Sequence, residues 1–176
     1  PGDGFPRNAY EETWCYVMAN LTIGISDLKV CRPPDVLVTY ALGSCVGICL
    51  LDSAAGVGGM SHIMLPDSTQ ATNGAATPMR FADTAIPMLV NEVVKLGASR
   101  SRLKAKIAGG AVMFVATSDR FNIGERNIAA VKAALRKEGI PIIAEDTGLN
   151  YGRTVFFYPE TGIMEVRAAS KGNRQL

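Results

Sequence analysis

Most of the chain follows short apolar runs or a two-residue alternation of apolar and polar positions, as β-strands do. Strands are expected at residues 18–27, 36–40, 45–51, 57–65, 106–111, 140–145, 154–158 and 162–166. Two segments instead carry apolar residues at helical spacing, at residues 79–96 and from a capping Asn122 to Gly139. Pro87 lies inside the first of these and is expected to kink or divide that helix.

Strands therefore outnumber helices and cluster as hairpins. At 176 residues, 48% of them hydrophobic, the chain can bury one substantial core. We expect an α/β fold with mixed, largely antiparallel sheets and two main helices packed outside. A single domain should span residues 18–168, preceded by a Gly/Pro-rich extension over residues 1–17 and followed by a polar tail over residues 169–176.

The segment from Val36 to Leu65 contains the most suggestive pair of reactive side chains. Cys45 follows a Gly-Ser turn, and His62 is the only histidine in the chain. A two- or four-residue turn around Ser53 and Ala54 would pair residues whose numbers sum to 107, which places Cys45 directly opposite His62. Their Cβ atoms would then lie ~4.5–5.5 Å apart on one face, and the imidazole should raise the thiolate fraction of Cys45. A three- or five-residue turn would change this register.

Composition excludes several other classes of protein. The net charge of +2 is too small to indicate nucleic-acid binding. The longest uncharged stretch, residues 36–51, is too short to span a membrane, and no signal peptide is visible, so the protein is expected to be cytoplasmic. The four cysteines contain no C-x-x-C pair, and the chain has a single histidine that could join them as a metal ligand. We therefore expect no metal and no cofactor.

A basic series precedes the strand at residues 106–111. Arg100, Arg102, Lys104 and Lys106 occupy alternate positions. They form either a solvated face or a docking surface for an acidic helical partner.

The central segment and several downstream motifs resemble the CheD family of chemoreceptor glutamine deamidases. The matching motifs, in chain order, are TYALGSCVGIC (39–49), GGMSHIMLPD (58–67), KIAGGAVMF (106–114), NIGERN (122–127) and EDTG (145–148). The resemblance covers roughly residues 19–167. One departure is Gly148-Leu149, where relatives often carry Gly-Gly.

The resemblance implies a layered α/β/β fold, shared with some toxin deamidases, and a Cys-His-Thr triad at Cys45, His62 and Thr39. It also implies the activity of a protein-glutamine glutaminase, with the cytoplasmic domains of chemoreceptors as substrates and a CheC-type phosphatase as a partner. Physical reasoning adds that the backbone N–H groups of Ser44 and Cys45 could stabilise the oxyanion.

Alternatives remain at this stage. Asp67, five residues after His62, could orient the imidazole in place of Thr39, whereas Asp52 is expected in the hairpin turn, far from Cys45. The protein could also be a regulator that binds CheC with an idle thiol, or a receptor methylesterase that uses the same site. A cysteine peptidase or small-molecule amidase is a further reading.

Overall fold

Two five-stranded sheets form the body of the protein in the computed structural model, which describes residues 17–72, 76–112 and 122–176. The first sheet has the order β1 (Asn20–Ile23), β3 (Val36–Leu42), β8 (Arg153–Tyr158), β9 (Ile163–Ala168) and β10 (Gly172–Gln175). The second has the order β2 (Asp27–Cys31), β5 (Val57–Ile63), β4 (Val46–Asp52), β6 (Lys104–Gly109) and β7 (Ile142–Thr147). The pairs β1–β3 and β6–β7 are parallel, and the other pairs are antiparallel.

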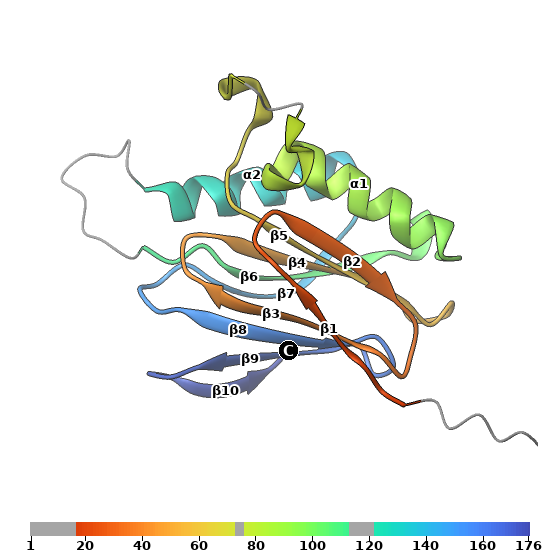
Figure 1. Cartoon of the computed structure of the whole chain (residues 1–176). Coiled ribbons are helices and arrows are strands. Elements are labelled where there is room, and N and C mark those ends of the chain that lie inside the picture. The colour runs from red at the N-terminus through yellow and green to blue at the C-terminus, as the bar shows by residue number, and fades with distance from the viewer. Residues whose placement is uncertain (1–16, 73–75, 113–121) are drawn as a thin grey trace, which may run out of the picture.

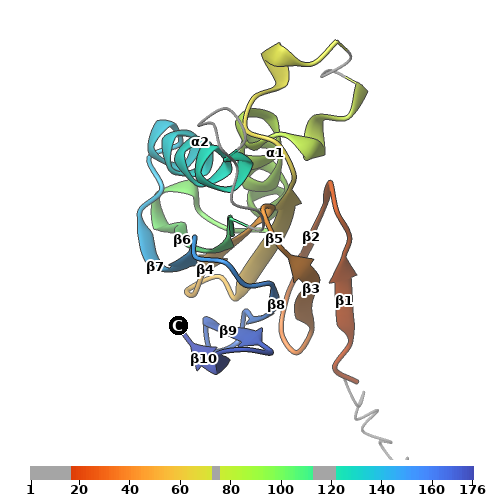
Figure 2. The ribbon, with the colours of Figure 1, turned by 90° about the vertical axis from the view of Figure 1, so that its left-hand side faces the viewer.

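Helices α1 (Ala82–Lys95) and α2 (Ile123–Lys137) cover one face of the second sheet, and the first sheet packs on its other face (Figure 1; Figure 2). Three short 3-10 turns complete the described elements: η1 (Ser68–Gln70), η3 (Pro78–Arg80) and η4 (Arg100–Arg102). The expected layered α/β/β fold with mixed sheets and two main helices is confirmed.

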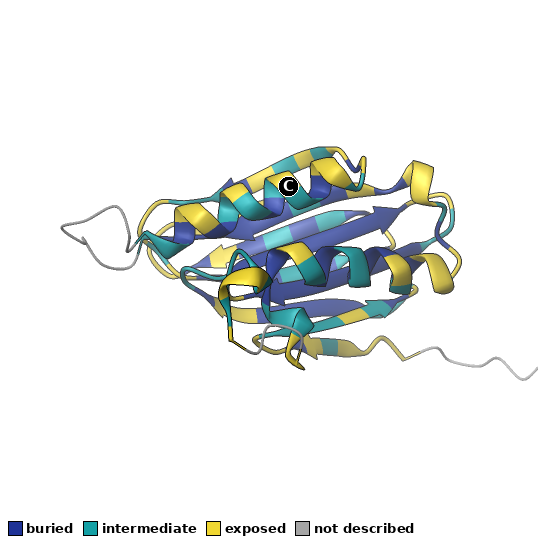
Figure 3. Cartoon of the chain, turned by 90° about the horizontal axis from the view of Figure 1, so that it is seen from above, coloured by how far each residue is buried: buried dark blue, intermediate teal, exposed yellow. Residues whose placement is uncertain are grey.

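Each interface between layers has its own apolar cluster, because successive strand residues point to opposite faces. Val46, Ile48 and Leu50 of β4 pack toward the helices, whereas Cys49 and Leu51 pack toward the first sheet. Figure 3 shows the largely buried strands beneath two helices whose outward residues are exposed. The core between the two sheets is the one that receives the candidate catalytic groups.

Some expected elements differ in the structure. The single strand expected over residues 18–27 is two strands, β1 and β2, in different sheets, because the chain turns at Ser26 with a positive φ of 60°. α1 continues through Pro87, which therefore does not divide it. The polar segment after residue 168 includes β10, which pairs with β9. Residues 1–16, most of the expected extension, lie outside the described residues.

Three of the four basic side chains at residues 100–106 have partners within the chain. Arg100 pairs with Glu138, Arg102 pairs with the buried Asp52, and the Lys106 ammonium donates to two backbone carbonyls. A docking role of this series for an acidic helical partner stays a prediction. Within the described ranges, no helix is both long and apolar enough to cross a membrane.

Candidate active site

Thr39 and His62 meet across the core between the two sheets. Thr39 lies on β3 of the first sheet and His62 on β5 of the second. The Thr39 hydroxyl oxygen lies 2.8 Å from His62 Nδ1, and both residues are buried, with exposed fractions of 0% and 1%. The packing of the two sheets thus joins side chains 23 positions apart into one polar contact.

A second hydrogen bond of Thr39 determines which nitrogen of His62 carries the proton. The hydroxyl donates to the backbone carbonyl of Ile23, at 2.8 Å. A hydroxyl has a single proton to donate, so toward His62 it acts as the acceptor, and Nδ1 carries the proton. Nε2 then presents its lone pair, which is the form of imidazole that can act as a general base.

The imidazole is neutral at physiological pH. Burial lowers the pKa of His62 from 6.5 to about 4, because the low-polarity surroundings disfavour the charged form. Its Nε2 is buried and has no hydrogen-bond partner in the described chain. A buried acceptor without a partner is costly and rare, and it is often associated with a catalytic role.

Cys45 lies just before β4 and is not directly opposite His62, so the predicted register is wrong. β4 and β5 pair with numbers that sum to 109, with Val46 opposite Ile63 and Gly47 opposite His62. The shift by two residues keeps every side chain on its predicted face. Cys45 therefore still faces the core between the sheets, where its side chain packs at the edge of the inner apolar cluster.

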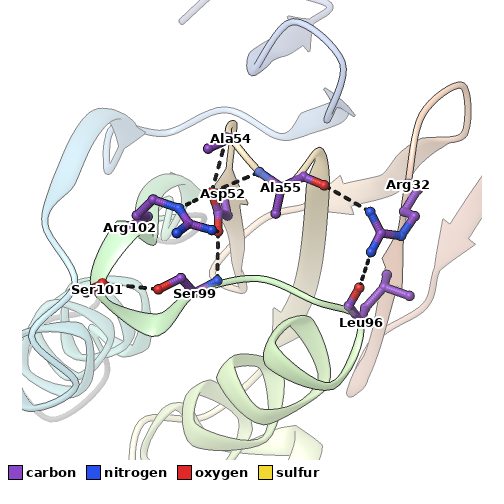
Figure 4. Close-up of polar contacts among 8 residues, drawn as sticks. All are labelled: Arg32, Asp52, Ala54, Ala55, Leu96, Ser99, Ser101 and Arg102. Carbon is purple, nitrogen blue, oxygen red and sulfur yellow. Dashed lines mark hydrogen bonds and ion pairs between the residues drawn. The ribbon is translucent and has the colours of Figure 1, made fainter.

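The side chain of Asp52 accounts for the observed register. Its carboxylate accepts hydrogen bonds from the backbone N–H groups of Ala54 and Ala55, which closes the turn over residues 53–56, and also from the N–H of Ser99 (Figure 4). Arg102 adds an ion pair at 2.8 Å. These contacts fix Asp52 as the last residue of β4, so the turn lies one residue later than the predicted four-residue turn.

Gly47 provides space for the polar pair. A Cβ atom at this position would lie 3.1 Å from Leu42 Cδ1 and 3.7 Å from Thr39 Cγ2. The absence of a side chain directly opposite His62 therefore lets Leu42 and Thr39 approach from the other sheet.

The Cys45 thiol is half-buried and predominantly protonated at neutral pH. Burial raises its pKa, and its own backbone N–H partly opposes that effect. No hydrogen bond joins the Cys45 sulfur to His62 among the described contacts, and His62 is not among the groups that shift the thiol pKa. The expected rise in thiolate fraction is therefore wrong for the free protein, because the imidazole is diagonal to the thiol and uncharged.

The turn that carries Cys45 is bound to the end of β6. The N–H of Gly110 donates to the Cys45 carbonyl and the N–H of Ala111 donates to the Gly43 carbonyl, each at 2.8 Å. Gly109 must be glycine here, because its φ is +112° and an added Cβ would lie 2.2 Å from the Cys45 carbonyl oxygen. In a trans peptide the N–H points opposite to the C=O. The Ser44 N–H therefore points away from β6.

The two carboxylates weighed as alternatives to Thr39 have other partners. Asp67 caps η1 and accepts from Thr69 and Gln70. Asp52 lies at the far end of β4 from Cys45, as expected. Of the three hydroxyl or carboxylate groups considered, Thr39 is the one that contacts His62.

Sequence reasoning missed Asn127, which is fully buried on α2 and donates to the backbone carbonyls of Ser44 and Met64. A signal was available, because Asn127 shares the four-residue spacing of Val131 and Leu135 and is thus a polar residue within an apolar stripe.

The described residues contain no cluster of three or more His, Cys, Asp or Glu side chains arranged to hold a metal ion. Their three cysteines, Cys31, Cys45 and Cys49, are free thiols. Cys15 lies outside the described range.

Comparisons with known proteins give a consistent family. Residues 64–168 match the family model described as CheD chemotactic sensory transduction. The chain is 53% identical to a probable chemoreceptor glutamine deamidase CheD of Clostridium novyi, over 89% of this chain and 97% of that one. It is 48% identical to a protein of the same description from Lachnoclostridium phytofermentans, over 89% and 98% of the two chains. A solved structure, Neisseria meningitidis protein NMB0706, aligns over 75% of this chain and 64% of that one with 11% identity and a TM-score of 0.47.

Proposed function

The chain belongs to the CheD family, and on that premise we propose that it deamidates glutamine side chains of chemoreceptors to glutamate, with release of ammonia. In this proposal Cys45 is the nucleophile, His62 the general base and acid, and Thr39 the residue that orients His62. Relatives that span almost the whole chain carry the description of chemoreceptor glutamine deamidase, which supports the substrate class.

One observation carries the proposed mechanism. Thr39 accepts from Nδ1 of His62 while it donates to Ile23, so the unpartnered Nε2 is left as the base. The register puts His62 and Cys45 on the same face of the second sheet. A protein that only binds a partner would gain nothing from a buried imidazole nitrogen without a hydrogen bond, because that nitrogen costs stability.

The neutral state of both groups determines the order of events in the first half-reaction. The Cys45 proton passes to Nε2 of His62 as the sulfur attacks the amide carbon, so a C–S bond forms and the carbonyl oxygen becomes an oxyanion. A hydrogen bond between a nucleophile and its general base is often absent in a free enzyme and forms only with substrate. The N–H groups of Ser44 and Cys45 are the proposed donors to the oxyanion.

Collapse of the intermediate breaks the C–N bond, and the imidazolium returns its proton to the leaving nitrogen, which departs as ammonia. Burial lowers the pKa of His62, which favours release of the proton by its imidazolium in this step. In the second half-reaction His62 takes a proton from water, the resulting hydroxide attacks the thioester, and the thiol leaves with that proton. The product is glutamate.

The partners in this proposal are the cytoplasmic domains of chemoreceptors and a CheC-type phosphatase, and the place of action is the cytoplasm. The relatives' description names the receptors. The phosphatase and the location follow from the sequence resemblance. The alternative is a purely regulatory protein that binds the phosphatase and whose Cys45 thiol takes no part in chemistry.

The test is peptide mapping of a chemoreceptor cytoplasmic fragment after incubation with the protein. Deamidation predicts conversion of specific glutamines to glutamate and an equal amount of released ammonia. A parallel incubation with a methylated fragment measures methanol, which reports methylesterase activity. Unchanged glutamines with methanol release would replace the proposal by the methylesterase, and no reaction on either fragment would favour the regulator.

A further inference from the structure

Asn127 links the two chain segments that carry the proposed nucleophile and base. Its side-chain nitrogen donates to the backbone carbonyl of Ser44 at 2.9 Å and to that of Met64 at 3.0 Å. Ser44 immediately precedes Cys45, and Met64 follows His62 by two residues. We call residues 43–45, which lead into β4, the nucleophile turn. The two protons of one amide group thus hold this turn and the end of β5 at a fixed separation.

The bond to Ser44 also sets the direction of a proposed oxyanion donor. The Ser44 carbonyl and the Cys45 N–H belong to one peptide group, in which they point in opposite directions. Because Asn127 holds the carbonyl toward α2, the Cys45 N–H points away from the helix. The same N–H stabilises the thiolate form of Cys45, which places it on the side of the sulfur, where the oxyanion would form.

α2 is seated closely enough to hold this amide in place. A Cβ atom on Gly124 would lie 2.5 Å from the Gly110 carbonyl oxygen, and one on Gly110 would lie 2.4 Å from Ile128 Cγ1. The first turns of the helix therefore pack directly on the backbone that also binds the nucleophile turn. Moving α2 away from Cys45 would break this close contact and open the core.

Stability alone does not account for an asparagine here. Asn127 is fully buried, and its side-chain oxygen has no hydrogen-bond partner among the described residues. A buried acceptor without a partner is unfavourable, and Val131 and Leu135 show that the neighbouring positions of this stripe accept apolar side chains. The two donated protons are the feature that an apolar residue could not supply.

We infer that Asn127 is a positioning residue that orients the Ser44–Cys45 peptide, so that the Cys45 N–H can stabilise the oxyanion during amide cleavage. This inference rests on the proposed deamidase function. Asn127 touches no reacting atom and acts through the backbone of the nucleophile turn.

The test compares two reactions of the same thiol. Deamidation of a receptor fragment needs oxyanion donors, whereas alkylation of Cys45 by iodoacetamide forms no oxyanion. Asn127→Leu keeps a side chain of similar size, makes it apolar and removes both donated protons. We expect kcat for deamidation to fall by about 10- to 100-fold, somewhat less than for deletion of a direct oxyanion donor. KM should stay within about twofold. The alkylation rate of Cys45 should fall much less than kcat, because the Cys45 N–H only partly offsets the effect of burial on the thiol pKa.

Two further variants keep the result interpretable. Asn127→Ala removes both donors without adding a buried charge, so it replaces Asn127→Leu if that variant does not fold. Asn122→Ala removes the cap of the same helix, where the Asn122 side chain accepts from the N–H of Glu125. It should lower thermal stability and leave kcat unchanged, which separates loss of helix stability from loss of peptide orientation.

An unchanged kcat in a folded Asn127 variant, beside an active wild type, would overturn this inference and leave the proposed function intact. A parallel fall in deamidation and alkylation would also overturn it, because that pattern indicates collapse of the whole site. A wild-type protein that alkylates at Cys45 but converts no glutamine would end the proposed function, and this inference with it.

Discussion

A single hydroxyl proton decides the chemistry of the imidazole. Because Thr39 gives that proton to the Ile23 carbonyl, it can only accept from His62, and Nε2 is left free to act as a base. A carboxylate in this position would raise the pKa of His62, whereas a hydroxyl leaves it low at about 4. The residue type thus favours a neutral thiol–imidazole pair over a preformed ion pair.

Thr39 can be tested by separating its shape from its hydrogen bonds. Thr39→Val keeps the branched shape and removes both polar contacts, so deamidation should fall strongly, within the ~10²–10⁴-fold that general acid–base catalysis contributes. Thr39→Ser retains the hydroxyl and should remain largely active. Initial rates on one receptor fragment give the ordering. If Thr39→Val matches the wild type, another group orients His62.

Exposure and burial predict the order of thiol reactivity. The Cys45 thiol is half-buried, whereas Cys31 and Cys49 are buried, and burial raises the pKa of Cys31 to about 12. In a Cys15→Ser background, iodoacetamide should label Cys45 first, slowly at neutral pH and faster as pH rises toward its elevated pKa. Mass mapping measures the order. Preferential labelling of Cys31 or Cys49 in the native protein would contradict the placement of Cys45.

At the scale of elements, the β4–β5 hairpin places His62 relative to the turn that carries Cys45. Asp52 closes this hairpin through backbone N–H groups and an ion pair with Arg102, at the end of β4 remote from Cys45. The carboxylate is ionised at neutral pH, because its hydrogen bonds from Arg102 hold its pKa near 2. The hairpin turn is therefore a structural feature, separate from the chemistry.

Asp52→Ala should accordingly lower stability more than activity. Loss of hydrogen bonds to a charged group predicts a fall of about 1–3 kcal/mol in the free energy of unfolding, with the deamidation rate per folded molecule retained. Denaturant titration measures the first quantity and initial rates the second. Glu160→Ala, an exposed position, is the control and should change stability by less than about 0.5 kcal/mol. Stability equal to that of the control would show that Asp52 does not anchor the turn.

Apart from β2 and β10, the sequence predicted the strands and the face that their residues occupy, but not how the strands meet. Alternation alone assigned Cys45 and His62 to one face, since side-chain direction has a period of two. Their register depended on an ion pair between the buried Asp52 and the half-exposed Arg102, fifty positions away, which no local pattern reveals. The contact of Thr39 with His62 spans two sheets and came only from the family resemblance. Asn127 broke an apolar stripe, and that irregularity was overlooked.

At the scale of the whole molecule, the buried imidazole couples folding to pH. His62 has a pKa of about 4 in the folded protein and close to 6.5 when unfolded. Below pH 6.5 the unfolded chain binds a proton that the folded chain does not, so stability is fully present above pH 6.5 and declines toward pH 4. The difference corresponds to a loss on the order of 3 kcal/mol.

Denaturant titrations between pH 4 and pH 7 measure this dependence. The matched control is His62→Gln, which removes the titrating group and should flatten the curve across that range. The stability that Asp52 contributes is lost only below about pH 4, where the carboxylate becomes protonated first in the unfolded chain and then in the folded one. A wild-type curve as flat as that of His62→Gln would show that the imidazole is not held neutral by burial.

The most direct test of the account is the deamidation rate of a folded Cys45→Ala protein on a receptor cytoplasmic fragment. Cys49→Ala is the matched control, because Cys49 lies on the same strand face but is buried and fully enclosed in the core. Peptide mapping should show no conversion of glutamine by Cys45→Ala, and conversion by folded Cys49→Ala at a rate close to that of the wild type. Substantial conversion by Cys45→Ala would contradict the assignment of Cys45 as the nucleophile.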